Sequence, residues 1–206
     1  MAEPIGKPSD GGQDEALEAA ANQGLSIADQ LDWHGQRHVR VGRVHLFKVG
    51  TDRVIYIGPH WYCSIIMLFI VVSVGCTYIF VFAVDMGLLH RAFGGLATSL
   101  SVITFLQCAL ADPGILAPNP NRDLKAEAND VVQLMPSAGG RVCAACDIVQ
   151  PIGSFHCEFC KVCVMGHDHH CPWMSKCIGS NNLGEFYTFL CTSIGSLVYI
   201  VVASVI

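Results

Sequence analysis

The chain has 206 residues, of which 52% are hydrophobic and 14% are charged. Soluble domains carry roughly 25% charged residues, so this composition argues against a water-soluble globular protein and indicates a membrane protein. The formal net charge of −5 argues against a nucleic-acid partner, because proteins that bind nucleic acids present a basic face.

A polar N-terminal segment precedes the first apolar one. Residues 1–40 are rich in Ala, Gly, Asp, Glu and Gln and show no apolar face, which predicts a disordered N-terminus. Residues 41–61 form a juxtamembrane segment. Apolar and polar residues alternate on both sides of Gly50-Thr51-Asp52, so a small hairpin is predicted here, with an irregular linker as the alternative.

Three apolar segments are predicted to cross a membrane, at 63–84, 92–111 and 187–206. A membrane-spanning helix needs roughly 20 apolar residues, whereas a run of about 10–14 is more typical of a helix buried in a protein core. The first segment has no charged residue, and Trp61 and Tyr62 precede it, as is typical of a membrane–water interface.

Basic residues predict the orientation of these spans. Six Lys or Arg residues precede the first span, Arg91 lies alone between the first and the second, and five follow the second. Lys and Arg concentrate in cytoplasmic loops. We therefore expect both the N-terminus and the long loop after the second span to face the cytosol.

A Cys- and His-rich segment, 143–186, follows a linker at 112–142. Seven of the eleven Cys residues lie in this segment, and in a reducing compartment such density indicates metal binding rather than disulfides. The segment has no long apolar periodicity, and domains of this size generally need a metal or disulfides to fold. The predicted fold class is therefore an α-helical membrane protein, with transmembrane helices and a small zinc-stabilised, cysteine-rich cytosolic domain.

The number of possible ligands exceeds what two zinc ions need. Two closed tetrahedral sites take eight ligands, and the segment offers seven Cys and four His: Cys143, Cys146, Cys157, Cys160, Cys163, Cys171, Cys177, His156, His167, His169 and His170. Six Cys and two His would fill both sites and leave one thiol and two His over. The spacing leaves open which thiol is spare. Cys171 is the best candidate, because a thiol beside His and Asp is the arrangement of an activated nucleophile.

A longer motif gives this segment a family resemblance. The run Asp168-His169-His170-Cys171-Pro172-Trp173, followed by Cys177-Ile178-Gly179 and Asn181-Asn182, resembles the cysteine-rich domain of the DHHC-type protein S-acyltransferases, the palmitoyltransferases. Asp112-Pro113-Gly114, after the second span, also resembles a motif of that family. The resemblance implies transfer of a long-chain acyl group, typically palmitoyl, from acyl-CoA to protein cysteines near the lipid bilayer, through an acyl-enzyme. It also implies two Zn²⁺ ions.

The resemblance further implies roles for individual residues. Cys171 would be the nucleophile, His169 its general base and Asp168 the group that orients His169. One zinc ion would be bound by Cys143, Cys146, His156 and Cys163, and the other by Cys157, Cys160, His170 and Cys177. Basic residues that are candidates for binding the phosphates of acyl-CoA are Arg141, Lys161 and Lys176, with a solvated surface as the alternative.

The chain also departs from the family pattern. Many members have Arg and His at the positions of Gly153 and Phe155, and Asn at that of Lys176. The chain ends within its third span, before the family's fourth span and C-terminal motifs, so we expect a truncated form or a fragment. The expected location is an endomembrane (Golgi or ER) or the plasma membrane, with a cytosolic active site. The alternative function is a catalytically inactive, membrane-tethered zinc interaction module.

Overall fold

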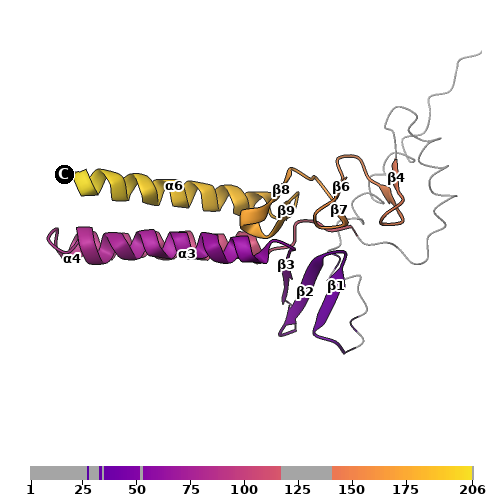
Figure 1. Cartoon of the computed structure of the whole chain (residues 1–206), viewed down its shortest axis with the longest axis horizontal. Helices are drawn as coiled ribbons and strands as arrows, with labels where there is room; N and C mark the ends of the chain where they lie inside the picture. The colour runs from indigo at the N-terminus through magenta and orange to yellow at the C-terminus, as the bar shows by residue number, and fades with distance from the viewer. Residues whose placement is uncertain (1–26, 28–32, 34, 52, 117–140, 206) are drawn as a thin grey trace, which may run out of the picture.

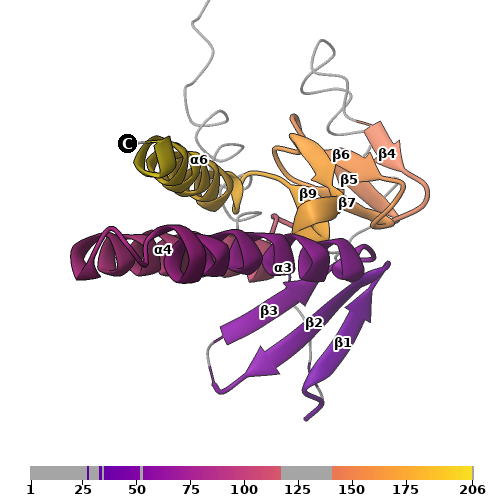
Figure 2. The same cartoon turned by 60° about the vertical axis from the view of Figure 1, so that its left-hand side comes forward.

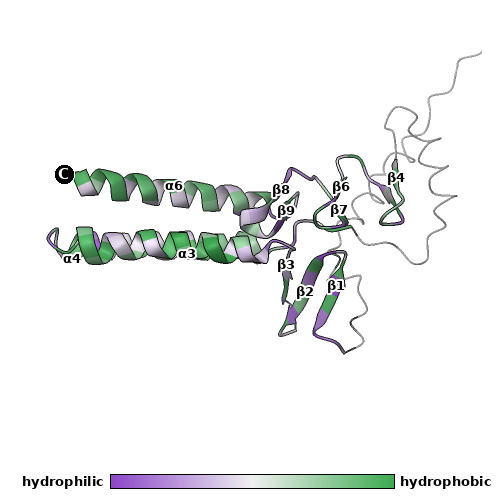
Figure 3. Cartoon of the chain, in the orientation of Figure 1, coloured by the Kyte–Doolittle hydropathy of each residue, from purple (hydrophilic) through white to green (hydrophobic). Residues whose placement is uncertain are grey.

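The computed structural model describes residues 27, 33, 35–51, 53–116 and 141–205. Three long helices run side by side, and small antiparallel sheets gather at one end of them (Figure 1). The helices are α3 (Trp61–Thr77), which continues as a π-helical turn η2 (Tyr78–Phe82), α4 (Leu88–Leu110) and α6 (Leu183–Val205). By length and composition each of the three could cross a membrane, and Figure 3 shows that hydrophobic residues cover most of the length of α3 and α6.

These helices confirm the predicted fold class, that of an α-helical membrane protein. Each begins two to four residues before the predicted span, at residues 61, 88 and 183 rather than 63, 92 and 187. Arg91 and Glu185 lie just before two of the predicted spans, and charged residues are costly at the centre of a bilayer. The first turn of a helix can project beyond the apolar layer, so the helices include both residues.

Helices α4 and α6 are joined by hydrogen bonds between hydroxyl groups. The hydroxyl oxygen of Ser101 lies 3.0 Å from that of Ser196, and the hydroxyl oxygen of Thr104 lies 2.8 Å from that of Thr192. A polar group in a hydrocarbon layer must find its partner within the protein. These two pairs therefore fix the register of one helix on the other.

A three-stranded antiparallel sheet precedes α3, and Figure 2 shows it below that helix. Its strands, in order, are β1 (His38–Val41), β2 (Val44–Val49) and β3 (Arg53–Ile57). Strands β2 and β3 form a hairpin rather than the alternative linker. Strand β1 lies largely within the segment predicted to be disordered, so the prediction was wrong there. The polar residues His38 and Arg40 made this short strand resemble the polar segment before it. Most of that segment lies outside the described residues.

The Cys-rich segment folds into three two-stranded antiparallel hairpins. They pair β4 (Arg141–Cys143) with β5 (Ile148–Gln150), β6 (Phe155–Cys157) with β7 (Val162–Val164), and β8 (His169–Cys171) with β9 (Lys176–Ile178). A 3-10 turn, η3 (Pro172–Met174), connects the last two strands. Most of the predicted linker at 112–142 lies outside the described residues.

Candidate functional site

Two hairpin turns bring cysteines together in pairs. In each turn two cysteines are separated by two residues and followed by a residue with positive φ, Asp147 (56°) in the first and Lys161 (55°) in the second. The backbone N–H of Asp147 donates to the carbonyl of Cys143 at 2.8 Å, and that of Lys161 donates to the carbonyl of Cys157 at 2.7 Å. The same local turn thus occurs twice, and a Cys-x2-Cys turn can direct both thiolates to one metal ion.

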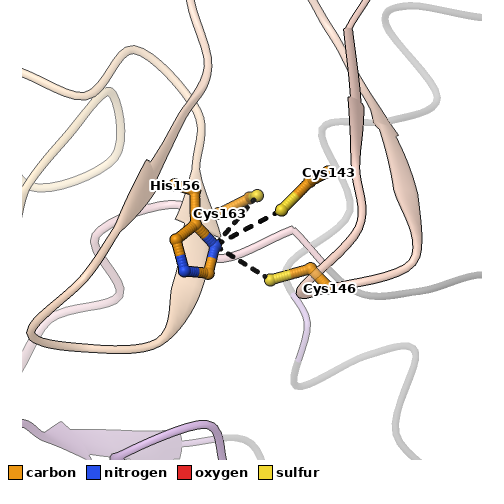
Figure 4. A group of neighbouring side chains, drawn as sticks. All are labelled: Cys143, Cys146, His156 and Cys163. Carbon is orange, nitrogen blue, oxygen red and sulfur yellow. Dashed lines mark hydrogen bonds between the residues drawn. The ribbon is translucent and has the colours of Figure 1, made fainter.

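Two groups of three Cys and one His form around these turns. The peripheral cluster consists of Cys143, Cys146, His156 and Cys163, and the central cluster consists of Cys157, Cys160, His170 and Cys177. Sulfur atoms lie 3.2–3.7 Å from Nδ1 of His156 in the peripheral cluster (Figure 4). They lie 3.4–3.6 Å from Nδ1 of His170 in the central cluster. The structure therefore brings together the two ligand sets that the resemblance implied.

Both clusters fit a tetrahedral zinc ion. Zinc binds sulfur at about 2.3 Å and imidazole nitrogen at about 2.0 Å, so its ligand atoms lie roughly 3.5–3.8 Å apart. The observed separations agree, including 3.6 Å between the sulfur atoms of Cys160 and Cys177. Hydrogen bonds with Cys157 and Cys160, together with burial, raise the pKa of Cys177, since three adjacent thiols cannot all ionise without a cation between them.

The central cluster packs against the N-terminal sheet. One apolar core joins the sheet to the cysteines of this cluster, and it includes Val44, Leu46, Tyr56, Val162 and Val164. The backbone N–H of Arg43 donates to the carbonyl of Cys160 at 2.8 Å. Gly42 lies so close to Lys161 that a Cβ would collide with the carbonyl oxygen of that residue. The sheet is thus an integral part of the Cys-rich fold.

The two clusters leave over Cys171, His167 and His169, which is one thiol and two His. Nδ1 of His169 donates a hydrogen bond to a carboxylate oxygen of Asp168 at 2.8 Å. The His169 ring also meets the ring of Phe186 edge-on, with 5.3 Å between centroids. The first residue of β8 therefore has a fixed imidazole outside both clusters.

Strand β8 explains how two adjacent His residues differ. Successive side chains of a strand point to opposite faces of it. His169 and Cys171 therefore share one face, while His170 points from the other face toward the sulfur atoms of the central cluster. His170, the one residue between His169 and Cys171, thus belongs to the central cluster.

Cys171 lies in a largely apolar environment. Its side chain belongs to a core with Phe105 of α4 and Phe189 of α6, and the residue is 7% exposed. Burial raises the pKa of the Cys171 thiol above its usual range, although backbone N–H groups of Met174 and Trp173 favour the thiolate. Cys171 thus lies near the ends of two membrane helices, in surroundings that favour the thiol form.

Comparison with known proteins finds relatives of the segment that holds both clusters and Cys171. A family model described as DHHC palmitoyltransferase matches residues 137–206. The chain is 35% identical over 108 residues to the palmitoyltransferase ERF2 of Candida glabrata, which covers 47% of this chain and 33% of that protein. The matched DHHC palmitoyltransferase domain therefore includes both clusters and Cys171. It is also 29% identical over 146 residues to the palmitoyltransferase ZDHHC3 of Homo sapiens, covering 68% of this chain and 48% of that protein. The matches span less than half the length of either relative.

One basic residue near the DHHC motif is not where the sequence suggested. Lys176 has no exposed surface, and its ammonium donates to the carbonyl oxygen of Ala109 near the end of α4. Burial lowers the pKa of Lys176 to about 8. The expectation that Lys176 binds a CoA phosphate is therefore corrected, because a fully buried ammonium cannot reach a phosphate in water. Lys161 is half-exposed and pairs with Glu158 at 2.5 Å, and Arg141 begins β4.

Sequence reasoning missed two residues, Gly58 and His60, that contact the DHHC hairpin, which is hairpin β8–β9. Ser175, in the turn of that hairpin, has a φ of 69°, and its hydroxyl accepts a hydrogen bond from the backbone N–H of Gly58 at 3.0 Å. Nδ1 of His60 lies 2.9 Å from Nε2 of His170. Both contacts join positions more than a hundred residues apart in the sequence, so no local spacing could have indicated them.

Proposed function

We propose that this chain carries the active site of a protein S-acyltransferase, which moves a long-chain acyl group, typically palmitoyl, from acyl-CoA to cysteine thiols of proteins. One observation carries the proposal. His170 contacts the sulfur atoms of the central cluster, whereas His169 and Cys171 occupy the other face of β8, with His169 hydrogen-bonded to Asp168. A module that only binds partner proteins has no use for an oriented imidazole beside a spare thiol.

Two zinc ions would hold this arrangement, one in each cluster. The ligands would be the eight residues of the peripheral and central clusters, and Cys171 would remain outside both. When bound, zinc would supply folding energy to a segment with little apolar core, because ligands that are apart in the unfolded chain converge only in the folded one.

Asp168 and His169 would act as a general base. Because the carboxylate of Asp168 accepts from Nδ1 of His169, the proton of the neutral ring lies on Nδ1 and the lone pair on Nε2 is available. Burial favours the thiol form of Cys171. This nucleophile would therefore need a base at the moment of attack.

Acyl transfer would proceed in two steps. In the first, the Cys171 sulfur bonds to the thioester carbonyl carbon while His169 takes the thiol proton; the bond from that carbon to the CoA sulfur breaks, and CoA leaves with the proton. In the second, a substrate cysteine gives its proton to His169 and attacks the acyl-enzyme, and Cys171 leaves as a thiol. One thioester is exchanged for another in each step, so no further reactant is needed.

The surroundings of Cys171 suit a long acyl chain and a membrane-bound substrate. Phe105 and Phe189 form apolar surroundings for the thiol at the ends of α4 and α6, and each buried CH₂ of an acyl chain contributes about 0.8 kcal/mol. The N-terminus and the DHHC segment would face the cytosol, and protein substrates would carry cysteines near the bilayer. Arg141 and Lys161 remain the candidates for the CoA phosphates.

The proposal is tested by incubating the chain, embedded in lipid nanodiscs, with radiolabelled palmitoyl-CoA. We expect a label that hydroxylamine removes, because it cleaves thioesters, and no label in Cys171→Ser, with two zinc ions bound in both proteins. Cys191→Ser, which changes an exposed cysteine of α6, is the control and should keep the label. An equal label on Cys171→Ser would exclude Cys171 as the acceptor, and an unlabelled wild-type chain would favour the zinc interaction module.

A further inference from the structure

We infer that His60, the residue before helix α3, is a positioning residue of the central cluster: it accepts a hydrogen bond from His170 and so ties the first membrane helix to the bound ion. The inference rests on the proposed zinc site in that cluster. It assigns a role to a residue outside the Cys-rich segment, where neither the ligand count nor the motif places one.

The direction of the hydrogen bond follows from the position of the sulfur atoms. Nδ1 of His170 lies 3.4–3.6 Å from the three sulfur atoms of the central cluster, so its lone pair points to the ion. The proton of the neutral His170 ring is then on Nε2, which lies 2.9 Å from Nδ1 of His60. His60 must therefore accept. A His that binds a metal usually donates its other ring N–H in this way, which fixes its tautomer and orientation.

His60 is itself held by several contacts. Its backbone N–H donates to the carbonyl of Ser175 at 3.1 Å, in the turn of the DHHC hairpin. Its ring meets the rings of Phe159 and Tyr62 edge-on, with 5.7 and 5.8 Å between centroids. Phe159, in the Cys-x2-Cys turn of the central cluster, also packs on the His170 ring at 4.8 Å. The His170 ring thus lies between an aromatic ring from its own segment and an acceptor from the start of a membrane helix.

The peripheral cluster has no equally close partner for its His among the described residues. Nε2 of His156 lies 3.9 Å from a carboxylate oxygen of Glu158, whose side chain is 75% exposed. That distance is too long for a hydrogen bond, and the group comes from the same hairpin. The difference provides an internal control, because a change at His60 should affect one ion and spare the other.

The position of His170 in strand β8 gives the contact its consequence. His170 lies between His169 and Cys171, so whatever fixes its ring also fixes the backbone that carries the proposed base and nucleophile. We therefore expect His60 to hold the DHHC strand at the depth where α3 begins, which is marked by the half-exposed Trp61 and Tyr62.

The test measures zinc release from the full chain in nanodiscs to the chelator 4-(2-pyridylazo)resorcinol. The wild-type chain should hold two ions. In His60→Ala one ion should be lost 10–100-fold more readily, which is the usual effect of removing an outer partner of a metal ligand, while the other ion is unchanged. His60→Asn, with an amide oxygen able to replace Nδ1, should restore retention. His60→Phe, which keeps a ring but has no acceptor, should behave as His60→Ala.

Alkylation of the cysteines, followed by mass spectrometry, identifies the cluster that loses its ion. We expect Cys157, Cys160 and Cys177 to react first in His60→Ala, and Glu158→Gln to leave both clusters protected. Retention in His60→Phe with loss in His60→Asn would show that only ring packing matters and would overturn the inference. Two stable ions in His60→Ala would overturn the role of His60 but leave the proposed zinc sites standing. A wild-type chain with fewer than two ions would overturn the proposed zinc sites and the role of His60 with them.

Discussion

The peripheral and central clusters have the same ligand types and nearly the same dimensions, but different surroundings. Each has three Cys and one His whose Nδ1 faces the sulfur atoms. The peripheral cluster packs against Ile148 and Leu116 and holds hairpin β4–β5 to hairpin β6–β7. The central cluster contacts the N-terminal sheet, the start of α3 and the strand of Cys171. The same coordination can therefore close a local hairpin or join distant parts of a chain.

The largest expected effect would separate the two clusters directly. Cys160→Ser removes a ligand of the central cluster, and we expect the sheet, the start of α3 and strand β8 to come apart together, because structural zinc contributes roughly 10–16 kcal/mol in small domains. Cys146→Ser should lose one ion and loosen hairpin β4–β5 alone. Zinc content and limited proteolysis would measure both. Equal cleavage within residues 38–60 in the two variants would remove the distinction.

The adjacent His residues of strand β8 provide the next test, because only one belongs to a cluster. His169→Ala should keep both ions but slow acylation of Cys171 by roughly 10²–10⁴-fold, as expected for a missing general base. His170→Ala should release the central ion. Single-turnover labelling with palmitoyl-CoA, beside zinc content, distinguishes the two. Loss of zinc from His169→Ala would assign His169 to a cluster and leave the nucleophile without its base.

A smaller effect is expected where the sheet meets the DHHC hairpin. A Cβ at Gly58 would collide with the backbone carbonyl of Ser175, so Gly58→Ala should destabilise the central cluster by about 1–3 kcal/mol, as overpacking does. Gly184→Ala is the matched control, since a Cβ there meets open space and Ala favours a helix by about 1 kcal/mol. The temperature at which the chain releases zinc would report both. An unchanged Gly58→Ala would mean that the sheet can shift without affecting the cluster.

The smallest expected effect concerns the peripheral cluster. Nε2 of Gln150 donates to the sulfur of Cys163 at 3.4 Å. A typical hydrogen bond contributes about 0.5–1.5 kcal/mol, so Gln150→Ala should speed release of the peripheral ion by roughly 2–10-fold. Release to a chelator measures it, with the central ion as the reference. An effect as large as that of His60→Ala would show that outer contacts serve both clusters equally.

Local patterns carried most of what the sequence predicted. Uncharged apolar runs indicated the three helices, and Cys-x2-Cys turns, which are complete within a few residues, indicated the metal-binding pairs. The ligand count left one thiol and two His over, but it could not say which. The family resemblance supplied that assignment. The count alone could not, because the two clusters interleave along the chain: Cys157 follows His156 directly, yet the structure puts them in different clusters.

Contacts between distant segments were beyond the sequence. Strand β1 has His and Arg on one face, so the sequence did not indicate a strand there. Its role as an edge strand follows from its pairing with β2 in the structure. Lys176 was expected on the surface because lysine usually is, but its ammonium reaches the end of a membrane helix. No sequence pattern indicated the contact of His60 with His170, since the two residues are 110 positions apart.

The hydrogen bond from Gly58 to Ser175 spans 117 positions, and this has a consequence for biosynthesis. At roughly 5–20 residues per second, a ribosome needs roughly 6–23 s to add the intervening chain. During that interval, in which the first two spans are also made, Val44, Leu46 and Tyr56 lack the part of their core that Cys157, Val162 and Val164 provide in the finished fold. Slow translation between positions 58 and 175 would prolong this exposure, so a change of synonymous codons there should alter the yield of folded protein without altering a single residue.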